Sequence, residues 1–279
     1  MRQYISQKDF DKDGLLTIIG KDYRYLRNVL RLVPGDMLSV RLPDGSLQNS
    51  TVAKVDESAK KIVLQLCADT SAPHSENQPD AKNLVEYWLF MFVPKSSKFD
   101  LIVRQATECG VSKIVPVLSE FSQSGAEKMN FRGERLERIV REARQQSGSA
   151  VDTKILDCVT VRQLCDMWNL DENSDSQKKD EKIEKIEKIE KIEKIEKFAC
   201  VLYERSDKTV TLKKALEPFG AGQIKKCALV CGAEGGISPA EIDLMMKAGF
   251  VPIHFETNIL RCETAALYGI ASVQSMICF

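Results

Sequence analysis

The sequence has only two histidines, His74 and His254, in 279 residues. So few histidines exclude a histidine-rich metal site, and a Ser-His-Asp triad would have to use one of the two. A zinc site would need cysteines from distant segments, which the sequence neither suggests nor forbids, and we expect no metal. His74 lies in a polar stretch and His254 in a short apolar one. We interpret His254 as a packed or cofactor-adjacent histidine rather than a catalytic base.

A Cys-x-x-Cys pair is also missing, although the chain has nine cysteines. An odd number of scattered cysteines is typical of reduced, buried thiols rather than of a disulfide framework. No apolar run has the length of a membrane span, and residues 1–14 lack the apolar core of a signal peptide. These absences predict a cytoplasmic protein with no membrane partner.

The sequence has no net charge, with 40 Lys and Arg against 40 Asp and Glu. This balance excludes the class of nucleic-acid binders that rely on bulk positive charge, but a local basic face can still bind RNA. A hydrophobic content of 43% is enough for a sizeable core. The length allows one large domain or two smaller ones.

Residues 1–70 have the pattern of a small β-rich domain. Turn residues at 34–36 and 43–45 separate short apolar runs. We expect strands at 15–19, 37–42, 47–55 and 61–67, and one short helix near 23–32. This pattern predicts a barrel, followed by a linker at 71–83 that is poor in apolar residues.

From residue 84 onward, apolar runs of strand length alternate with helical patterns. Phe99, Ile102, Val103 and Ala106, for example, have the spacing of one face of a helix. The alternation predicts an α/β domain whose mostly parallel sheet is covered on both faces. We expect strands at 84–93, 114–118, 154–159, 198–204, 227–231 and 251–255, and helices at 98–109, 131–147, 161–168, 212–219, 239–248 and 262–277.

Residues 182–197 are five Lys-Ile-Glu repeats and a final lysine. A period of three makes the isoleucines drift around any helix that they form. We interpret residues 172–197 as a low-complexity insertion that projects into solvent. A helix that binds a partner is the less favoured alternative.

The stretch Gly232-Ala-Glu-Gly-Gly236 joins an expected strand to an expected helix. Ser238, Pro239 and Glu241 have the pattern of a helix start with a capping box. Glycines let the backbone approach a ligand closely, although a tight turn without a ligand explains them as well. The stretch is neither a Rossmann fingerprint nor a phosphate-binding P-loop.

The last expected helix begins with Arg261 and Glu263. A glutamate in the first turn is explained by the helix dipole, but an arginine there is unfavourable and requires a partner. That partner could be a phosphate, a carboxylate or a polarised carbonyl group. We therefore favour a functional role for Arg261.

Three further segments are rich in cations. Residues 95–98 contain two lysines, and residues 132–144 have an arginine at every third position. These arginines suit a phosphate-binding face, but a solvated face paired with nearby glutamates is slightly favoured by the spacing alone. Residues 23–31 combine three arginines with two tyrosines and no acid, a composition that suits RNA.

The stretches Gly232–Gly236 and Ile259–Ala265, together with the basic segments and their order, resemble the RsmE family of the SPOUT methyltransferases over nearly the whole chain. The resemblance implies a PUA-like, RNA-binding β-barrel at 1–70. It also implies a SPOUT α/β domain at 84–279 with a deep trefoil knot, although most chains avoid knots. The implied cofactor is S-adenosylmethionine. The implied substrate is N3 of a uridine in the 16S rRNA of the small ribosomal subunit, and the implied assembly is a homodimer.

The resemblance also implies roles for particular residues. The expected catalytic residues are Arg261, Glu263 and Glu234. The expected cofactor-binding residues are Tyr203, Glu204, Gly232, Ala233, Glu234, Gly235, Gly236, His254, Phe255, Ile259, Leu260, Arg261, Thr264 and Ala265. The expected RNA-binding residues are Arg24, Arg27, Arg31, Lys95, Lys98, Arg141, Arg144 and Gln146.

The chain departs from the family pattern at four places, which comprise six residues. Ala233 replaces a proline, Arg24-Tyr25 a histidine pair, Ser149 an arginine and Phe255-Glu256 a Leu-Gly pair. We expect Ala233 and Phe255 to be tolerated, because the cofactor contacts there are largely made by the backbone. Ser149 removes a candidate RNA-binding charge, and Glu256 could alter the cofactor pocket.

The implied reaction requires an unpaired or flipped uridine, because N3 lies on the pairing edge of the base. It also requires an in-line geometry, a proton acceptor, and a cation near the carbonyl oxygens. Two alternatives stay open: a SPOUT enzyme for another RNA site or a 2′-hydroxyl, and a non-catalytic RNA-binding assembly factor. A metabolic α/β enzyme would not explain the arginines of the first domain.

Overall fold

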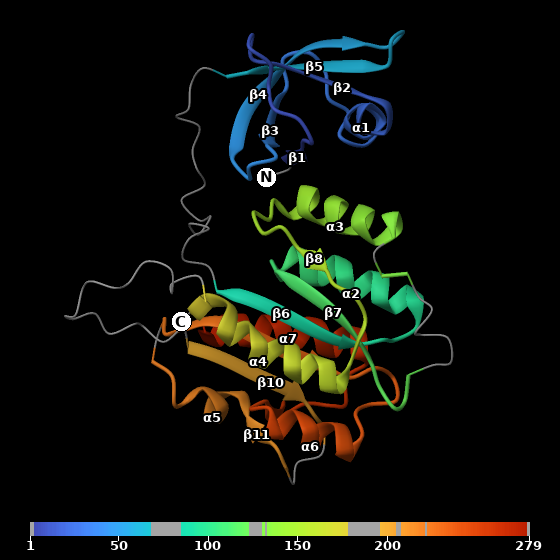
Figure 1. Ribbon diagram of the computed structural model, residues 1–279. Coiled ribbons are helices and arrows are strands. Elements are labelled where there is room, and N and C mark those ends of the chain that lie inside the picture. The colour runs from blue at the N-terminus through green and yellow to red at the C-terminus, as the bar shows by residue number, and fades with distance from the viewer. Residues whose placement is uncertain are drawn as a thin grey trace, which may run out of the picture. The chain divides into compact units, whose positions relative to one another are not determined.

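The computed structural model describes residues 3–67, 85–122, 130–131, 133–177, 196–204, 208–220 and 222–277. It divides into two compact units (Figure 1). The N-terminal unit consists of residues 1–83 and 141–150, and the C-terminal unit of residues 84–140 and 151–279. His74, the expected linker and most of the Lys-Ile-Glu repeats lie outside the described residues.

The N-terminal unit is built on a five-stranded sheet in the order β1-β3-β4-β5-β2. Only β1 and β3 pair in parallel, and the other pairs are antiparallel. Two turns of this unit use glycine with a left-handed φ, 92° at Gly35 and 87° at Gly45. The strands are β1 (Gln3–Ile5), β2 (Leu15–Ile19), β3 (Met37–Arg41), β4 (Leu47–Asp56) and β5 (Lys61–Leu66). Strands β1 and β2 form the two ends of this order, so a closed barrel stays a prediction.

The expected helix at 23–32 takes a different form. The structure has a short α-helix, α1 (Gly20–Arg24), that continues as a π-helix, η1 (Tyr25–Val29). The amide of Leu30 donates to the carbonyl of Tyr25 at 3.1 Å, one residue farther than in an α-helix. Arg31 then ends the helix with a φ of 57°. Sequence spacing at the α-helical period cannot reveal such a widened turn.

Residues 141–150 complete the N-terminal unit through polar contacts. A carboxylate oxygen of Asp22 accepts hydrogen bonds from the Tyr4 hydroxyl at 2.8 Å and from Arg141 at 2.7 Å. Burial, followed by the contact with Asp22, raises the pKa of Tyr4, so its hydroxyl stays a donor. The Gln3 amide donates to the carbonyl oxygens of Arg144 and Ser149. These contacts fix residues 141–150 to β1 and α1.

The C-terminal unit has an all-parallel eight-stranded sheet (Figure 1). Its order is β11-β13-β10-β12-β6-β7-β8, and β9 also pairs with β7. The strands are β6 (Glu86–Phe92), β7 (Lys113–Leu118), β8 (Lys154–Ile155), β9 (Val159–Thr160), β10 (Glu196–Leu202), β11 (Val210–Thr211), β12 (Ile224–Cys231) and β13 (Val251–His254). The prediction of a mostly parallel sheet is confirmed.

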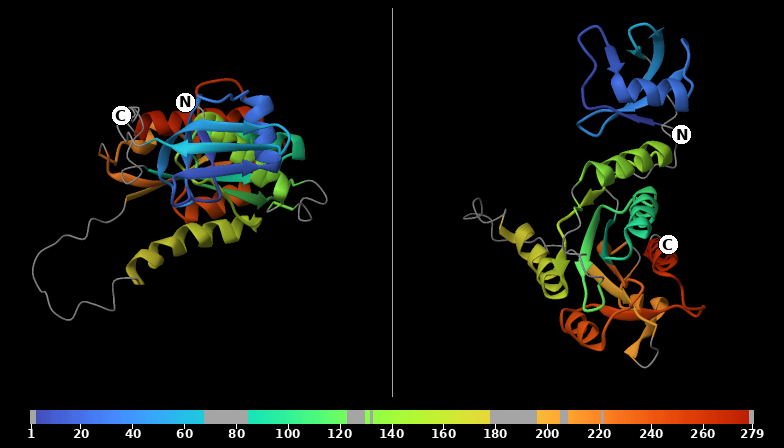
Figure 2. Two further views of the ribbon diagram at one scale, coloured as in Figure 1. Left: turned by 90° about the horizontal axis from the view of Figure 1, so that it is seen from above. Right: turned by 90° about the vertical axis from the view of Figure 1, so that its right-hand side faces the viewer.

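Helices cover both faces of this sheet (Figure 2). Leu89 and Met91 of β6 belong to one buried cluster, and Trp88, Phe90 and Phe92 to the other. This alternation follows from the period of two along a strand, and burial on both sides explains why the strands are apolar throughout. The helices are α2 (Ser96–Glu108), α3 (Glu134–Ser147), α4 (Val161–Gln177), α5 (Leu212–Leu216), α6 (Pro239–Lys247) and α7 (Cys262–Ile277). Only residues 134–140 of α3 belong to this unit.

Several expected elements of the C-terminal unit have other bounds in the structure. Helix α4 continues to Gln177 and β10 begins at Glu196, so both enter the segment 172–197, whose low-complexity insertion stays a prediction. A helix can continue into polar sequence because each added residue gains one backbone hydrogen bond after nucleation. The expected strand 154–159 is two short strands, β8 and β9, which pair with different parts of β7. No helix of the described residues is long and apolar enough to cross a membrane.

The packing of η1 generates a first prediction. Leu26 is fully buried in the core of the N-terminal unit, whereas Val29, on the same π-helix, is 61% exposed. Leu26→Ala should destabilise this unit by about 2–5 kcal/mol, because it leaves a cavity. Val29→Ala should change its stability by less than about 0.5 kcal/mol. Hydrogen exchange of peptides from residues 3–66 measures both, and equal protection in the two variants would contradict the burial of Leu26.

Candidate functional site

The glycine loop, residues 232–236, leaves β12 and turns back on itself. The amide of Gly236 donates to the carbonyl of Ala233 at 3.0 Å, and Gly236 has a left-handed φ of 75°. A side chain at Gly235 would place its Cβ 2.7 Å from the Cβ of Phe121, in the turn that follows β7. The loop therefore requires glycine at 236 for its backbone conformation and at 235 for its packing against Phe121.

The helix start after this loop confirms the predicted capping box. Ser238 accepts a hydrogen bond from the amide of Glu241, and a Glu241 oxygen accepts from the amide of Ser238 at 2.9 Å. The second carboxylate oxygen of Glu241 accepts from the amide of Glu120 at 2.9 Å. Glu241 is only 7% exposed. One buried carboxylate thus joins the start of α6 to the turn beside the glycine loop.

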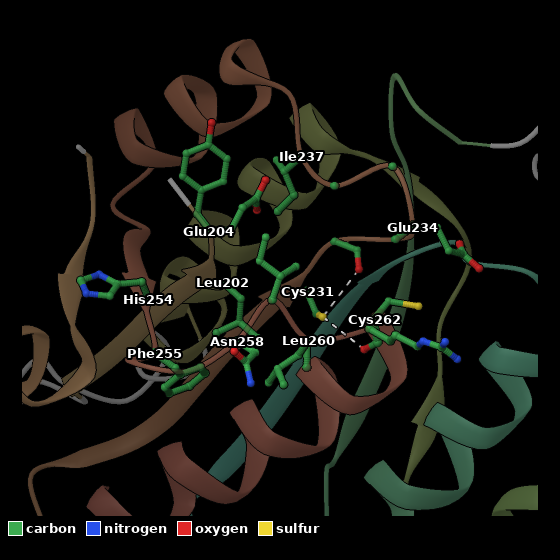
Figure 3. Close-up of a pocket in the computed structure, with 18 of the residues that line it drawn as sticks. Leu202, Glu204, Cys231, Glu234, Ile237, His254, Phe255, Asn258, Leu260 and Cys262 are labelled. Carbon is green, nitrogen blue, oxygen red and sulfur yellow. Dashed lines mark hydrogen bonds between the residues drawn. The ribbon is translucent and has the colours of Figure 1, made fainter. Parts of the chain in front are cut away.

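The start of α7 lies against the same loop. The thiol of Cys231 is within 3.7 Å of the carbonyl oxygens of Gly232 and Cys262 (Figure 3). Burial raises the pKa of Cys231, so it is a thiol that can donate to both carbonyls. The residues before α7, Thr257 to Arg261, are largely exposed. They connect β13 to the helix and form a wall opposite the glycine loop.

A cavity of about 550 Å³ lies between the glycine loop and this wall (Figure 3). This volume is within the range of about 300–1,000 Å³ found for small-molecule sites. Its lining combines apolar side chains, such as Ile237 and Ile253, with the backbone of the glycine loop. His254 also lines the cavity, and its Nδ1 is 2.8 Å from the Thr209 hydroxyl. Such a lining suits a molecule with both apolar and hydrogen-bonding parts.

The structure brings nearly all expected cofactor-binding residues to this one cavity. Thr264 is the exception, because it is exposed on α7 and does not line the cavity. The sequence analysis missed seven lining residues, which are Leu202, Cys231, Ile237, Ile253, Thr257, Asn258 and Cys262. They neighbour predicted ones along the chain, so continuity with the two motifs was the only signal that could have found them.

The three expected catalytic residues lie at or near the cavity. Arg261 and Glu234 line it, and Glu263 contacts a lining residue, Lys98. The ammonium of Lys98 is 3.3 Å from a Glu234 oxygen and 3.2 Å from a Glu263 oxygen. Lys98 was expected at an RNA-binding surface, but the structure places it among the carboxylates. Arg261 is exposed and has no ion-pair partner among the described residues.

Both carboxylates have a pKa below the ordinary value. Burial opposes ionisation of Glu234, but its own backbone amide and Lys98 outweigh this effect. For Glu263, its own backbone amide is the largest cause, and the Cys262 thiol and Lys98 add to it. Both side chains are therefore ionised near neutral pH. Burial, followed by the hydrogen bond to Glu263, raises the pKa of Cys262 to about 11, so it stays a thiol.

The other expected RNA-binding residues do not lie in the cavity. Arg27 and Arg31 surround a hollow of the N-terminal unit together with Tyr23, Asn28 and Lys60. Arg27 is paired there with Glu57 at 2.9 Å. Arg24 and Gln146 are exposed, as is Lys95 at the start of α2. Arg141 is paired with Asp22, and Arg144 is half-buried.

The cavity offers no metal site that the described residues reveal. No group of three or more His, Cys, Asp or Glu side chains in that part of the chain is placed to hold a metal ion. The charged groups are instead Glu204, Glu234 and Lys98 on the lining, with Glu263 beside them and Arg261 at the exposed wall. This arrangement can bind a cationic molecule and stabilise negative charge on a second one.

Comparison with known proteins gives consistent matches. The model of the family described as "RNA methyltransferase domain" matches residues 81–274. Ribosomal RNA small subunit methyltransferase E 2 of Borreliella burgdorferi is 27% identical, over 93% of this chain and 92% of its own length. Ribosomal RNA small subunit methyltransferase E of Buchnera aphidicola is 24% identical, over 99% and 93%.

Solved structures match the fold along the whole chain. Ribosomal RNA small subunit methyltransferase E from Neisseria gonorrhoeae, bound to S-adenosyl methionine, superposes with a TM-score of 0.71 at 21% identity. The match covers 99% of this chain and 98% of that one. A structure from Legionella pneumophila that contains the same bound cofactor has a TM-score of 0.69 at 18% identity, covering 98% and 97%.

The buried carboxylate of Glu241 generates the second prediction. Glu241→Ala should destabilise the C-terminal unit by about 1–3 kcal/mol, because it leaves the buried amide of Ser238, and the part-buried one of Glu120, without their protein partner. Asp243→Ala is the matched control, since Asp243 is on the same helix in an exposed pair with Lys208, and it should cost less than about 1 kcal/mol. Both tryptophans, Trp88 and Trp168, are in the C-terminal unit. Urea unfolding followed by tryptophan fluorescence therefore measures the difference, and equal losses would contradict the role of Glu241.

Proposed function

The chain belongs to the RNA methyltransferase domain family, and within it to the RsmE methyltransferases; from this membership we propose the reaction. In the proposed reaction, the protein transfers a methyl group from S-adenosylmethionine to N3 of a uridine in the 16S rRNA of the small ribosomal subunit. The curated relatives are named ribosomal RNA small subunit methyltransferases, and the Neisseria structure is bound to S-adenosyl methionine. Both support the proposal.

The observation that carries it is the cavity between the glycine loop and the start of α7. Its volume of about 550 Å³ suits a molecule of the cofactor's size. S-adenosylmethionine carries a positive sulfonium and a positive ammonium group. The carboxylates of Glu204 and Glu234 on the lining, with Glu263 beside them, attract such charges. The glycines of the loop have no side chains of their own, so their backbone groups can approach the base or ribose and hydrogen-bond it.

In the proposed mechanism, the cofactor supplies a methyl group from its sulfonium, and this chain's residues prepare the nitrogen that receives it. Uridine N3 must lose its proton, and the resulting negative charge spreads to O2 and O4. Arg261 is exposed at the cavity wall, where its guanidinium can stabilise that charge or position a phosphate. Glu234 or Glu263, both ionised near neutral pH, accepts the proton or positions the cofactor.

We also propose RNA-binding roles for the cationic surfaces outside the cavity. Arg27, Arg31 and Lys60 surround a hollow of the N-terminal unit, and exposed Arg24 adds to its charge. Tyr23 lines the same hollow. Arginines beside an aromatic side chain suit phosphates and unpaired bases. The PUA-like barrel and a contribution from Lys95, Arg141, Arg144 and Gln146 belong to this proposal.

Assembly and knotting are further parts of the proposal. Helix α7 is largely apolar, and two of its large hydrophobic side chains, Tyr268 and Met276, are 45% and 43% exposed to solvent. A second copy of the chain would cover such side chains in a homodimer. The proposed trefoil knot and the proposed cytoplasmic location follow from the same family membership.

The test of the reaction is methyl transfer from labelled S-adenosylmethionine to small ribosomal subunits that lack this methyl group. Nucleoside analysis of the digested RNA should find the label in 3-methyluridine. Label in another nucleoside would show that the methylated target is another RNA site or a 2′-hydroxyl. Cofactor binding without any transfer would point to another RNA substrate. Absence of both would favour the assembly-factor alternative.

Arg261 allows a sharper prediction. Arg261→Ala should lower the single-turnover rate by about 10²–10³-fold, the usual loss when one group that stabilises an oxyanion is removed. Its effect on cofactor affinity should be smaller. Arg162→Ala removes an exposed arginine from α4 and serves as the matched control, with an unchanged rate. An unchanged single-turnover rate in Arg261→Ala would remove this residue from the mechanism.

A further inference from the structure

Lys98 is the point where three separate parts of the chain meet. Its ammonium lies 3.3 Å from Glu234 of the glycine loop and 3.2 Å from Glu263 of α7, and Lys98 itself belongs to α2. It is also 3.9 Å from the thiol of Cys262. The side chain is 27% exposed, and those of Glu234 and Glu263 are 31% and 17% exposed. The contact is therefore shielded in part from water.

The position of Lys98 on its helix is electrostatically unfavourable by itself. It lies in the first turn of α2, where the helix dipole favours negative charge and disfavours a cation. The two carboxylates offset this cost. The backbone amide of Lys95, at the N-cap of the same helix, also points to Glu234 at 3.4 Å. The start of α2 as a whole is thus directed at the Glu234 carboxylate.

The shared cation also determines how the two carboxylates affect each other. Two ionised carboxylates close together raise each other's pKa, and one of them tends to take up a proton. A lysine ammonium between them reverses this effect. The pKa of Lys98 is raised, first by its hydrogen bond to Glu263 and, against burial, by its contact with Glu234. All three groups are therefore charged together near neutral pH.

We propose that Lys98 is a positioning residue of the methyl-transfer site, which holds Glu234 and Glu263 in place with both of them ionised. Lys98 does not act as an RNA phosphate contact in this proposal. The inference rests on the proposed function, because it assigns Lys98 a role in that reaction. The lysine acts through the carboxylates, of which Glu234 is on the cavity lining and Glu263 is beside it.

The charged neighbours of the network agree with this role. The groups that face Lys98 are Glu234, Glu263 and the un-ionised thiol of Cys262. Arg261 lines the same cavity but is exposed. Lys98 is the only cation paired with Glu234 or Glu263 in the described part of the chain. Removing it leaves the two carboxylates without a cation that bridges them.

The test compares Lys98→Met, Lys98→Arg and the matched control Lys247→Met, which removes an exposed lysine at the end of α6. Lys98→Met should lower the single-turnover rate near neutral pH by roughly 10²-fold, the order of loss expected when reacting groups are misplaced. Its KM for the ribosomal substrate should stay near that of the wild type. The control should match the wild type in both quantities.

The pH profile separates a positioning role from a merely structural one. The ammonium stabilises the ionised carboxylates, so its removal raises their pKa values. The acid limb of the pH–rate profile should therefore move to higher pH in Lys98→Met, whereas Lys98→Arg keeps the cation and should stay near the wild-type position. Titration of ¹³C-labelled glutamate carboxyl groups by NMR should show the same upward shift without any need for activity.

Three results would overturn the proposal. A higher KM with an unchanged rate at saturating RNA would make Lys98 a phosphate contact. Unchanged glutamate titration in Lys98→Met would remove its effect on the carboxylates. A profile in Lys98→Arg that stays at the position of Lys98→Met would show that charge is not the cause. If the wild-type protein transfers no methyl group, the proposed function fails, while the NMR titration still decides whether Lys98 controls both carboxylates.

Discussion

The site depends on the close packing of the glycine loop against the turn that follows β7. There is no space for a side chain on Gly235, because its Cβ would lie 2.7 Å from that of Phe121. Glu241 joins the start of α6, which follows the loop, to the same turn by accepting hydrogen bonds from Ser238 and Glu120. The carboxyl ends of neighbouring parallel strands lie at one edge of the sheet, which is where α/β proteins place their ligands. The close contact turns this general edge into a defined cavity.

Charge then gives the cavity its chemical character. Glu204, Glu234 and Glu263 place three carboxylates on or beside it, and Lys98 and Arg261 are its cations. The two cations differ, because Lys98 is bound between carboxylates and Arg261 is exposed. Lys98 is paired with Glu234 and Glu263 and so holds these carboxylates in place, whereas the guanidinium of Arg261 is available to a substrate. In the proposed function, this division would let one site attract a positive cofactor and still stabilise an anion on RNA.

Patterns along the sequence predicted the larger helices and strands and the two loops of the site, because these features are determined by residues close together in the sequence. The bounds of α7 were predicted in full, and the capping box of Ser238 and Glu241 was predicted from its spacing alone. The π-helix at Tyr25 and the three-residue strand β1 have no comparable pattern. The place of Lys98 depends on a contact across more than 130 residues. Its local sequence indicates only a cation at the start of a helix, which suits RNA equally well.

Of the departures from the family pattern, Ala233 and Phe255 line the cavity. Glu256 is exposed and is absent from the cavity lining. Phe255 packs edge-on against Tyr268 with ring centroids 4.8 Å apart, a favourable aromatic geometry that holds this wall against α7. Ala233 keeps the turn closed through its carbonyl, which accepts from Gly236, and Ser149 contacts Gln3 through its carbonyl as well. The contacts at Gly235 and Glu241 stabilise the fold with or without a cofactor. The match of residues 81–274 to the RNA methyltransferase domain family is what favours the enzyme over the assembly factor.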